Sequence, residues 1–211
     1  MEKKIRELFP EIEWIKDPEL QAKVVASYVD ALKTGGWEPE DMDKIPFTLL
    51  IPNCPFSYLE HVRGVTRVAK RAMDEFNAIY AAKDAKFTID NDLLVAGALL
   101  HDVARTEPQH AQRGAEYLTE LGYPRVADIV RQHHGLDAPG ELNEAAVVFL
   151  ADKLVQGERF VGVEARFAAS EARCLTPEAK AAHAAQLAQA RQVEKLIRQA
   201  APRARIEPTA F

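Results

Sequence analysis

The chain has 211 residues, of which 47% are hydrophobic, enough for the core of one domain with a helical extension. Its net charge of −5 argues against nucleic-acid binding, because a negative surface repels a phosphate backbone. The N-terminal sequence has no apolar signal core, and the longest apolar run, 93–100, is too short to cross a bilayer. We therefore expect a cytoplasmic protein with no nucleic-acid or membrane partner, in which Cys54 and Cys174 are reduced thiols.

Helical periodicity dominates the chain, and no alternating strand pattern is bounded by turn residues. The stretch 37–56 is broken by four prolines, which predicts a loop packed on the core. The sequence thus predicts an all-α bundle. The expected helices are 19–34, 57–82, 91–105, 110–121, 124–134, 143–156, 161–173 and 177–200.

Three of these segments have distinct expected positions. LLVAGALL in 91–105 is apolar on every side, so this helix should be central, with Asp90 or Asn91 capping its start. The Ala- and Gln-rich helix 177–200 is expected on the surface or facing a partner. The tail from Pro202 is expected to be loose.

Histidines and aspartates interrupt the apolar segments. His101 and Asp102 directly follow LLVAGALL, and Asp152 lies in the apolar run VVFLADKLV. Burying an unpaired imidazole or carboxylate costs roughly several kcal/mol of folding free energy. A metal ion removes this cost, because it binds the neutral imidazole and the ionised carboxylate.

Each of these residues has an ordinary alternative when taken alone. A His-Asp dipeptide is often a helix end or a surface feature, and an aspartate after an apolar run can be a cap or an ion-pair partner. The order favours a metal site, because the members occur at the end or on the inner face of separate predicted helices. The ordered set is His61, His101, Asp102, His110, His133 and Asp152.

This order resembles the HD superfamily of metal-dependent phosphohydrolases over about 57–170. The matching segments are YLEHVRGVTRVA, AGALLHDVAR and FLADKLVQGERF, which contain His61, the pair His101 and Asp102, and Asp152. His110 in PQHAQRGAEYL and His133 in IVRQHHGL look like the two extra histidines of the binuclear subgroup. The resemblance implies an HD-domain helical bundle over 57–174, preceded by a helical extension at 1–56 and followed by a helix and tail at 175–211.

Particular branches of the superfamily share further sequence features. The segment ADKLVQGERFVGVEARF is similar to the branch that cleaves dinucleoside tetraphosphates symmetrically, and ALLHDVAR to ADKLV resembles HD domains fused to molybdenum-cofactor nucleotidyltransferases. Ala104-Arg105 replaces the familiar Gly-Lys after the HD pair, and the short spacing from Asp102 to His110 predicts a tight turn through Glu107-Pro108. No GYP motif follows His133, which argues against a cyclic-dinucleotide phosphodiesterase.

The resemblance implies a division of labour among the ligands. The first of two divalent ions would be held by His61, His101, Asp102 and Asp152. Asp102 would also contact the second ion, which His110 and His133 complete. A metal-bound hydroxide would then attack phosphorus. Iron or manganese is favoured from the family, while zinc, nickel and cobalt also suit nitrogen and oxygen ligands.

Phosphate recognition needs cations besides the metals. Arg105 and Lys153 are the main candidates for catalytic and substrate contacts, with Arg159 and His134 as further substrate contacts. A solvated helix charge, or an exposed helix-end histidine for His134, is the alternative. Arg63 and Arg67 are weaker candidates for phosphate contacts, and His183 is expected to be a plain surface residue. The aromatic residues before 57 could roof the pocket and stack on a base, or simply pack; they are Trp14, Trp37, Phe47 and Phe56.

The leading function is therefore hydrolysis of a phosphoester or phosphoanhydride in a nucleotide or another small phosphorylated metabolite. Two alternatives stay open at this point. One is a mixed-valent di-iron oxygenase, which uses the same ligands in the superfamily. The other is a nucleotide-sensing HD module without turnover. A homodimer is also possible.

Overall fold

The computed structural model describes residues 1–48, 54–82 and 88–200. The all-α prediction is confirmed, with one small antiparallel hairpin, β1 (Val155–Gln156) and β2 (Arg159–Phe160). The N-terminal elements are α1 (Glu2–Leu8), η1 (Pro10–Trp14), α2 (Pro18–Gly35) and η2 (Pro39–Asp41). The remaining helices are α3 (Tyr58–Ala81), α4 (Asn91–Leu100), α5 (His110–Glu120), α6 (Pro124–Gln132), α7 (Glu144–Leu154), α8 (Val163–Glu171) and α9 (Pro177–Ala200).

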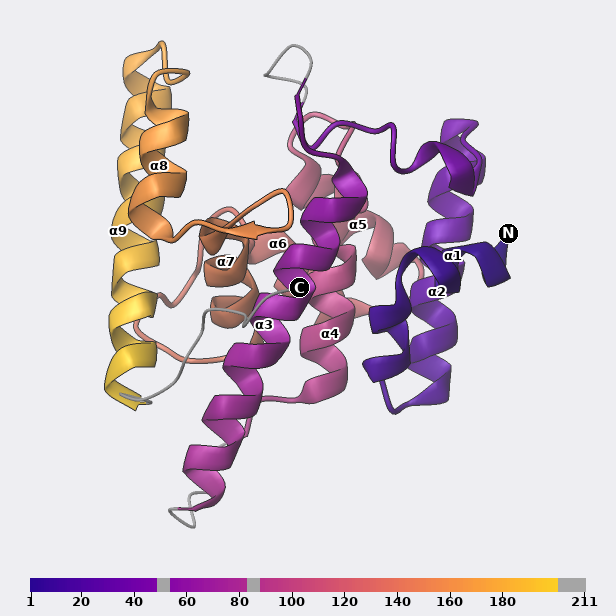
Figure 1. Ribbon diagram of the computed structural model, residues 1–211, viewed down its shortest axis with the longest axis horizontal. Helices are drawn as coiled ribbons and strands as arrows, with labels where there is room; N and C mark the ends of the chain where they lie inside the picture. The colour runs from indigo at the N-terminus through magenta and orange to yellow at the C-terminus, as the bar shows by residue number, and fades with distance from the viewer. Residues whose placement is uncertain (49–53, 83–87, 201–211) are drawn as a thin grey trace.

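The helices α3 and α4 run side by side through the middle of the molecule (Figure 1). The N-terminal α1 and α2 lie on one side of this pair, and α8 and α9 lie on the other (Figure 1). The predicted central position of LLVAGALL is confirmed, because every side chain from Leu94 to Leu100 is buried. One apolar cluster joins α3, α7 and α9, and a second joins α1, η1 and α2 to α4 and α6.

Side-chain caps mark the start of three of the helices that position site residues, α3, α4 and α7. Ser57 and Glu60 form a capping box at the start of α3, one turn before His61. The Asp90 carboxylate accepts hydrogen bonds from the first backbone N–H groups of α4, which decides between the two predicted caps. Asn143 caps α7 in the same way. These local signals fix the start of each helix and hence the direction in which its ligand residues face.

The helix predicted at 91–105 ends earlier, at Leu100. Residues after it form turns, in which the Val103 N–H donates to the Leu100 carbonyl and the Arg105 N–H donates to the Asp102 carbonyl. These are contacts between residues three apart, which tighten the chain and break the α-helical pattern. His101 and Asp102 therefore lie in a turn just beyond α4.

The hairpin between α7 and α8 was not predicted. Its strands have two residues each, too short to show an alternating pattern. Gly157 makes its turn with φ +59°, a left-handed conformation suited to glycine. Helix α3 approaches this turn closely at Gly64, where an added Cβ would lie 2.9 Å from the Gly157 carbonyl oxygen. The hairpin thus takes the place of the predicted end of helix 143–156.

The C-terminal helix α9 is part of the core as well as the surface. Ala190, Val193 and Ile197 on its inner face are buried in the same cluster as α7 and α8. The surface or partner-facing role predicted for 177–200 therefore describes only its outer face. The predicted loose tail from Pro202 lies outside the described residues. No helix within the described residues has the length and apolar character needed to span a membrane.

The proline-broken stretch predicted as a packed loop is described on both sides of 49–53. Phe47 and Thr48 are buried there, as predicted, and Pro46 forms an isolated bridge with Ser57. Cys54 and Cys174 are free thiols that are partly buried.

Candidate metal centre and adjoining cleft

All six predicted metal ligands converge on one place in the bundle. Five of them are buried, and the His110 side chain is 13% exposed. They are His61 in the first turn of α3, His101 and Asp102 just after α4, His110 at the start of α5, His133 just after α6, and Asp152 in α7. Helices far apart in sequence thus bring nitrogen and carboxylate donors together, as the ordered motif predicts.

The first donor group combines His61, His101 and Asp152. Each supplies one ligand atom, and these atoms all lie within 4.8 Å of one another. His61 Nε2 is 3.0 Å from Asp152 Oδ1, and His101 Nε2 is 3.5 Å from Asp102 Oδ2. This arrangement offers two imidazoles and two carboxylates to one cation.

The second donor group lies on the other side of Asp102. His110 Nε2 is 3.0 Å and His133 Nε2 is 3.5 Å from Asp102 Oδ1, and the two imidazole nitrogens are 3.2 Å apart. His134 belongs to the same cluster, with its ring centroid 4.5 Å from that of His110. The two oxygens of one carboxylate therefore face two separate histidine groups.

The Asp102 carboxylate is held in its ionised form. Burial raises its pKa, but the adjoining His101 and Arg105 side chains outweigh this and bring the pKa well below its usual range. Asp152 behaves similarly, because the neighbouring Lys153 and His61 overcome the effect of burial on its pKa. Both carboxylates are thus ready to bind a cation without losing a proton.

Two histidines are fixed in the tautomer that metal binding requires. His101 Nδ1 lies 2.7 Å from the Ala98 carbonyl oxygen, and His133 Nδ1 lies 2.7 Å from the Val130 carbonyl oxygen. A carbonyl only accepts hydrogen bonds, so the hydrogen of each ring is on Nδ1 and the Nε2 lone pair faces the site.

A cation fits this donor set for a further reason. Within the described residues, both ring nitrogens of His61 and Nε2 of His101 are buried and make no hydrogen bond. Buried polar atoms are rarely left without a partner, because the loss of water costs free energy. A divalent metal ion would accept the lone pair of one His61 ring nitrogen and that of His101 Nε2, so the residues present suit such an ion.

A strained turn brings His110 back to Asp102 across the short spacing seen in the sequence. Gln109, immediately before α5, has φ +54°, which non-glycine residues seldom adopt. The reversal lies one residue beyond the predicted Glu107-Pro108 turn and starts α5 with His110 against the Asp102 carboxylate. Backbone strain of this kind commonly accompanies functional sites.

Burial lowers the pKa of His61 from 6.5 to about 4, so metal-free protein should lose stability in acid. Between pH 6.5 and 4 the unfolded chain binds a proton at this residue and the folded chain does not. The free energy of unfolding therefore decreases as the pH is lowered through this range. The shift corresponds to about 3 kcal/mol. Urea unfolding of chelator-treated protein at pH 7 and pH 4.5 should show this loss. His61→Gln should flatten the dependence, and equal slopes in His61→Gln and the wild type would contradict the assignment.

A cleft of about 580 Å³ opens beside the donor groups. Arg105 and Lys153, the two main cation candidates, both line it. Arg105 donates to the Phe47 carbonyl at 3.0 Å and to Asp102 Oδ1 at 3.3 Å, so it is held against the second histidine group. The buried Lys153 ammonium donates to Asp152 Oδ2 at 2.5 Å and to the His133 carbonyl at 3.1 Å. Both cations are therefore positioned at the metal end of the cleft.

Other predicted substrate contacts have different positions. His134 lines the cleft, whereas Arg159 is exposed on β2 and is absent from the described lining. Arg63 and Arg67 instead pair with the buried Glu11 carboxylate, with Nε–Oε1 distances of 3.2 Å and 2.8 Å. Arg63 and Arg67 therefore bind the N-terminal extension through Glu11, and the structure does not support the predicted phosphate contacts for them.

The aromatic residues divide in the same way. Phe47 lines the cleft and its ring centroid is 4.2 Å from that of His61. Trp14 and Trp37 are 36% and 42% exposed and do not line this cleft within the described residues. Phe56 packs on Gly157. Of the four, only Phe47 is placed to roof the pocket.

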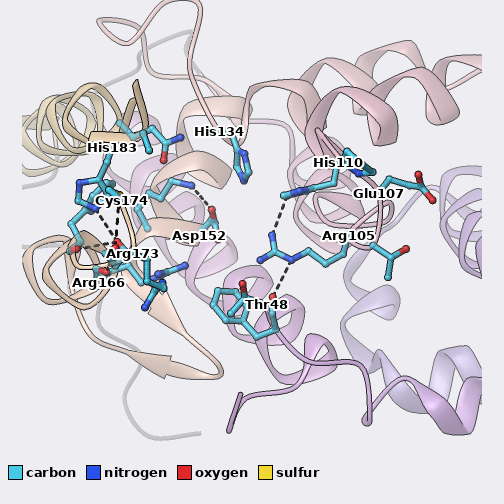
Figure 2. A pocket seen from close by; sticks show the side chains of 18 residues that line it. Thr48, Arg105, Glu107, His110, His134, Asp152, Arg166, Arg173, Cys174 and His183 are labelled. Carbon is cyan, nitrogen blue, oxygen red and sulfur yellow. Dashed lines mark hydrogen bonds and ion pairs between the residues drawn. The ribbon is translucent and has the colours of Figure 1, made fainter. Parts of the chain in front are cut away.

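Three residues of the cleft were missed or misjudged from the sequence. Figure 2 shows Arg166, Arg173 and His183 together on the side of the cleft opposite Arg105. His183 is half-buried and its Nε2 lies 2.9 Å from Ser170 Oγ, so the prediction of a plain surface residue was wrong. Arg166 lies on α8, within the segment ADKLVQGERFVGVEARF, and Arg173 lies in the turn after α8, but neither position was predicted to contact substrate.

Comparison with known proteins agrees with the geometry. Residues 58–156 match the HD domain family. This part of the chain is an HD domain. The match begins at α3 and ends after Asp152, so it includes all six converging residues. HD domains in general carry metal-dependent phosphohydrolase-type activity and bind divalent metals, which suits the donor groups described above.

Two curated relatives match parts of the chain. A tRNA (cytidine(56)-2'-O)-methyltransferase from Picrophilus torridus is 29% identical over 143 residues, which make up 59% of this chain and 39% of that protein. An uncharacterized protein from Methanocaldococcus jannaschii is 29% identical over 84 residues, 38% of this chain and 46% of that protein. The chain therefore spans less than half the length of either relative. No solved structure gives a significant match.

Proposed function

We propose that this HD-domain protein is a metal-dependent phosphohydrolase that cleaves a phosphoester or phosphoanhydride in a nucleotide or another small phosphorylated metabolite. The main supporting observation is the position of Asp102. Its two carboxylate oxygens face separate histidine groups beside a cleft that also contains Arg105 and Lys153. Such a carboxylate suits two neighbouring cations, and the adjoining arginine and lysine suit a phosphate.

Each ligand has a role in this proposal. The first ion would be held by His61, His101, Asp102 and Asp152, and the second by Asp102, His110 and His133. Bound divalent ions supply Lewis acidity, which lowers the pKa of water and offsets charge on phosphoryl oxygens. The donor types suit iron or manganese, and also zinc, nickel or cobalt.

The cations of the chain would position the phosphate. Arg105 is restrained by the Phe47 carbonyl and Asp102, so its planar guanidinium is held in a fixed direction. Lys153 adds charge beside Asp152 and also joins α7 to the end of α6. His134 contributes a further polar group at the wall. The cleft volume of about 580 Å³ lies within the range of small-molecule sites and would admit a nucleotide.

Metal analysis followed by a phosphatase screen tests this proposal. We expect about two transition-metal ions per chain when the protein is loaded with iron or manganese, since two donor groups are available. Phosphate release from at least one nucleotide or dinucleoside polyphosphate should stop after chelator treatment and return with added metal.

The screen should be run aerobically and anaerobically with the same loaded protein. Equal phosphate release in both is expected of a hydrolase. An oxygen-dependent product without phosphate release, or no turnover of any phosphate substrate by protein shown to be metal-loaded, would contradict the proposal.

A further inference from the structure

The end of the cleft away from the metal centre has its own set of polar side chains. Arg166, Ser170, Arg173 and Cys174 come from α8 and the turn after it, and His183 comes from α9. Figure 2 shows this group facing Arg105 and His110 across the cleft, with Asp152 and His134 between the two sides. We refer to the residues Arg166, Arg173 and His183 as the distal group.

Arg166 carries a largely buried charge without an acidic partner. Its Nε donates to the Val155 carbonyl at 3.1 Å, and its guanidinium carbon is 5.1 Å from the Phe47 ring centroid. No carboxylate of the described residues lies within ion-pair distance of it, whereas Arg105 and Lys153 each have an aspartate partner. Burial also lowers the Arg166 pKa, which shows the cost of holding this charge away from water.

Arg173 is more exposed than Arg166, but it too has no acidic partner among the described residues. Its Nη1 donates to the Ala169 carbonyl at 2.7 Å, and no described carboxylate pairs with it. The carboxylates that line the described cleft are Glu107 and Asp152. Asp152 already pairs with Lys153 and His61. Glu107 is exposed and lies on the side of the cleft opposite the distal group (Figure 2). The distal end therefore has two guanidinium charges that the protein itself does not neutralise.

We propose that Arg166 and Arg173, with His183 beside them, bind a second phosphoryl group of the substrate. This inference rests on the proposed function and narrows it to bisphosphates or polyphosphates, with the phosphate that is cleaved at the metal end and another at the distal group. A guanidinium can form two parallel hydrogen bonds to phosphate oxygens, and two guanidiniums offset the charge of a dianion. Phe47 links the two ends, since the guanidinium carbons of Arg105 and Arg166 lie 5.2 Å and 5.1 Å from its ring centroid.

Binding of inorganic phosphate to chelator-treated protein tests the distal group without any turnover. Calorimetric titration should give saturable binding that weakens at least about tenfold in Arg166→Gln and in Arg173→Gln, since each removes charge-assisted hydrogen bonds. Arg191→Gln is the matched control, because this arginine pairs with Glu164 on the surface and does not line the cleft. Acetate, used as a separate titrant, should bind at least about tenfold more weakly than phosphate, because it carries a single charge.

Two results would overturn the inference. One is phosphate binding that is absent from the wild type or unchanged in both cleft variants. The other is acetate binding as tight as that of phosphate, which would assign a carboxylate to this end. The two arginines are tested separately so that misfolding of one variant, seen by circular dichroism, still leaves the other to decide.

Turnover gives a second, independent readout. In Arg166→Gln and Arg173→Gln, KM for a nucleoside bisphosphate or a dinucleoside polyphosphate should rise at least about tenfold with kcat within a factor of about three. KM for p-nitrophenyl phosphate, which has a single phosphate, should stay unchanged. Equal losses on both substrate types would overturn the distal assignment and leave the hydrolase proposal intact, whereas absence of any turnover would contradict the hydrolase proposal and leave the phosphate titration as the test.

Discussion

Replacing Asp102 with asparagine should remove metal and activity together. The carboxylate faces both histidine groups, with His110 Nε2 at 3.0 Å from one oxygen and His101 Nε2 at 3.5 Å from the other. An amide keeps the size of the side chain but loses the negative charge that two cations require. We expect metal content to fall below one ion per chain, and kcat/KM on the substrate found by screening to fall at least about a hundredfold.

Asp74→Asn is the control for Asp102→Asn. Asp74 is an exposed aspartate on α3 that pairs with Lys70, so its loss removes one carboxylate without touching the centre. Metal should be measured by mass spectrometry after dialysis, and the fold by circular dichroism. Two bound metals and full turnover in folded Asp102→Asn would show that the ligand assignment is wrong.

Glu11→Ala should lower the free energy of unfolding far more than loss of a surface ion pair would. The carboxylate is 1% exposed and contacts Arg63 at 3.2 Å and Arg67 at 2.8 Å. Removing one partner of a buried ion pair costs about 3–5 kcal/mol, because the other charge stays behind. We expect about 3 kcal/mol, the lower end of that range, because the two arginine side chains are 29% and 26% exposed and can regain water.

Urea unfolding monitored by circular dichroism measures this change. Glu13→Ala is the matched control, since Glu13 lies two residues away, pairs with Arg6 and has a side chain that is 62% exposed. Its loss should cost less than about 1 kcal/mol, as expected of surface ion pairs. A Glu11→Ala protein as stable as Glu13→Ala would show that this ion pair does not secure the N-terminal segment to α3.

The converging residues could be predicted from sequence because their chemistry conflicts with their surroundings. His101, Asp102 and Asp152 interrupt or end apolar runs, where a polar side chain needs a reason to be present. Their positions at the end or on the inner face of separate predicted helices then indicate that they meet, and the bundle confirms this. The assignment of ions to each group stays a prediction, as do the domain limits at 56 and 174.

Other features left no such signal. The end of α4 at Leu100 depends on turn hydrogen bonds, which a continuing helical pattern does not reveal. Arg166 and Arg173 look like solvated helix charges in sequence, and only the packing of α8 against α9 makes them part of a cleft. Glu11 likewise looks exposed among the charged residues of the N-terminus, although its carboxylate is buried between two arginines.

The hydrogen bonds from His101 and His133 to main-chain carbonyls bear on how the protein takes up ions in neutral solution. With Nδ1 protonated and Nε2 bare, neither ring has to change tautomer before an ion arrives. Burial lowers the pKa of His61 to about 4, so its imidazole is already uncharged at neutral pH. Ion uptake near pH 7 should therefore need no change of tautomer in His101 or His133 and should displace almost no proton from His61.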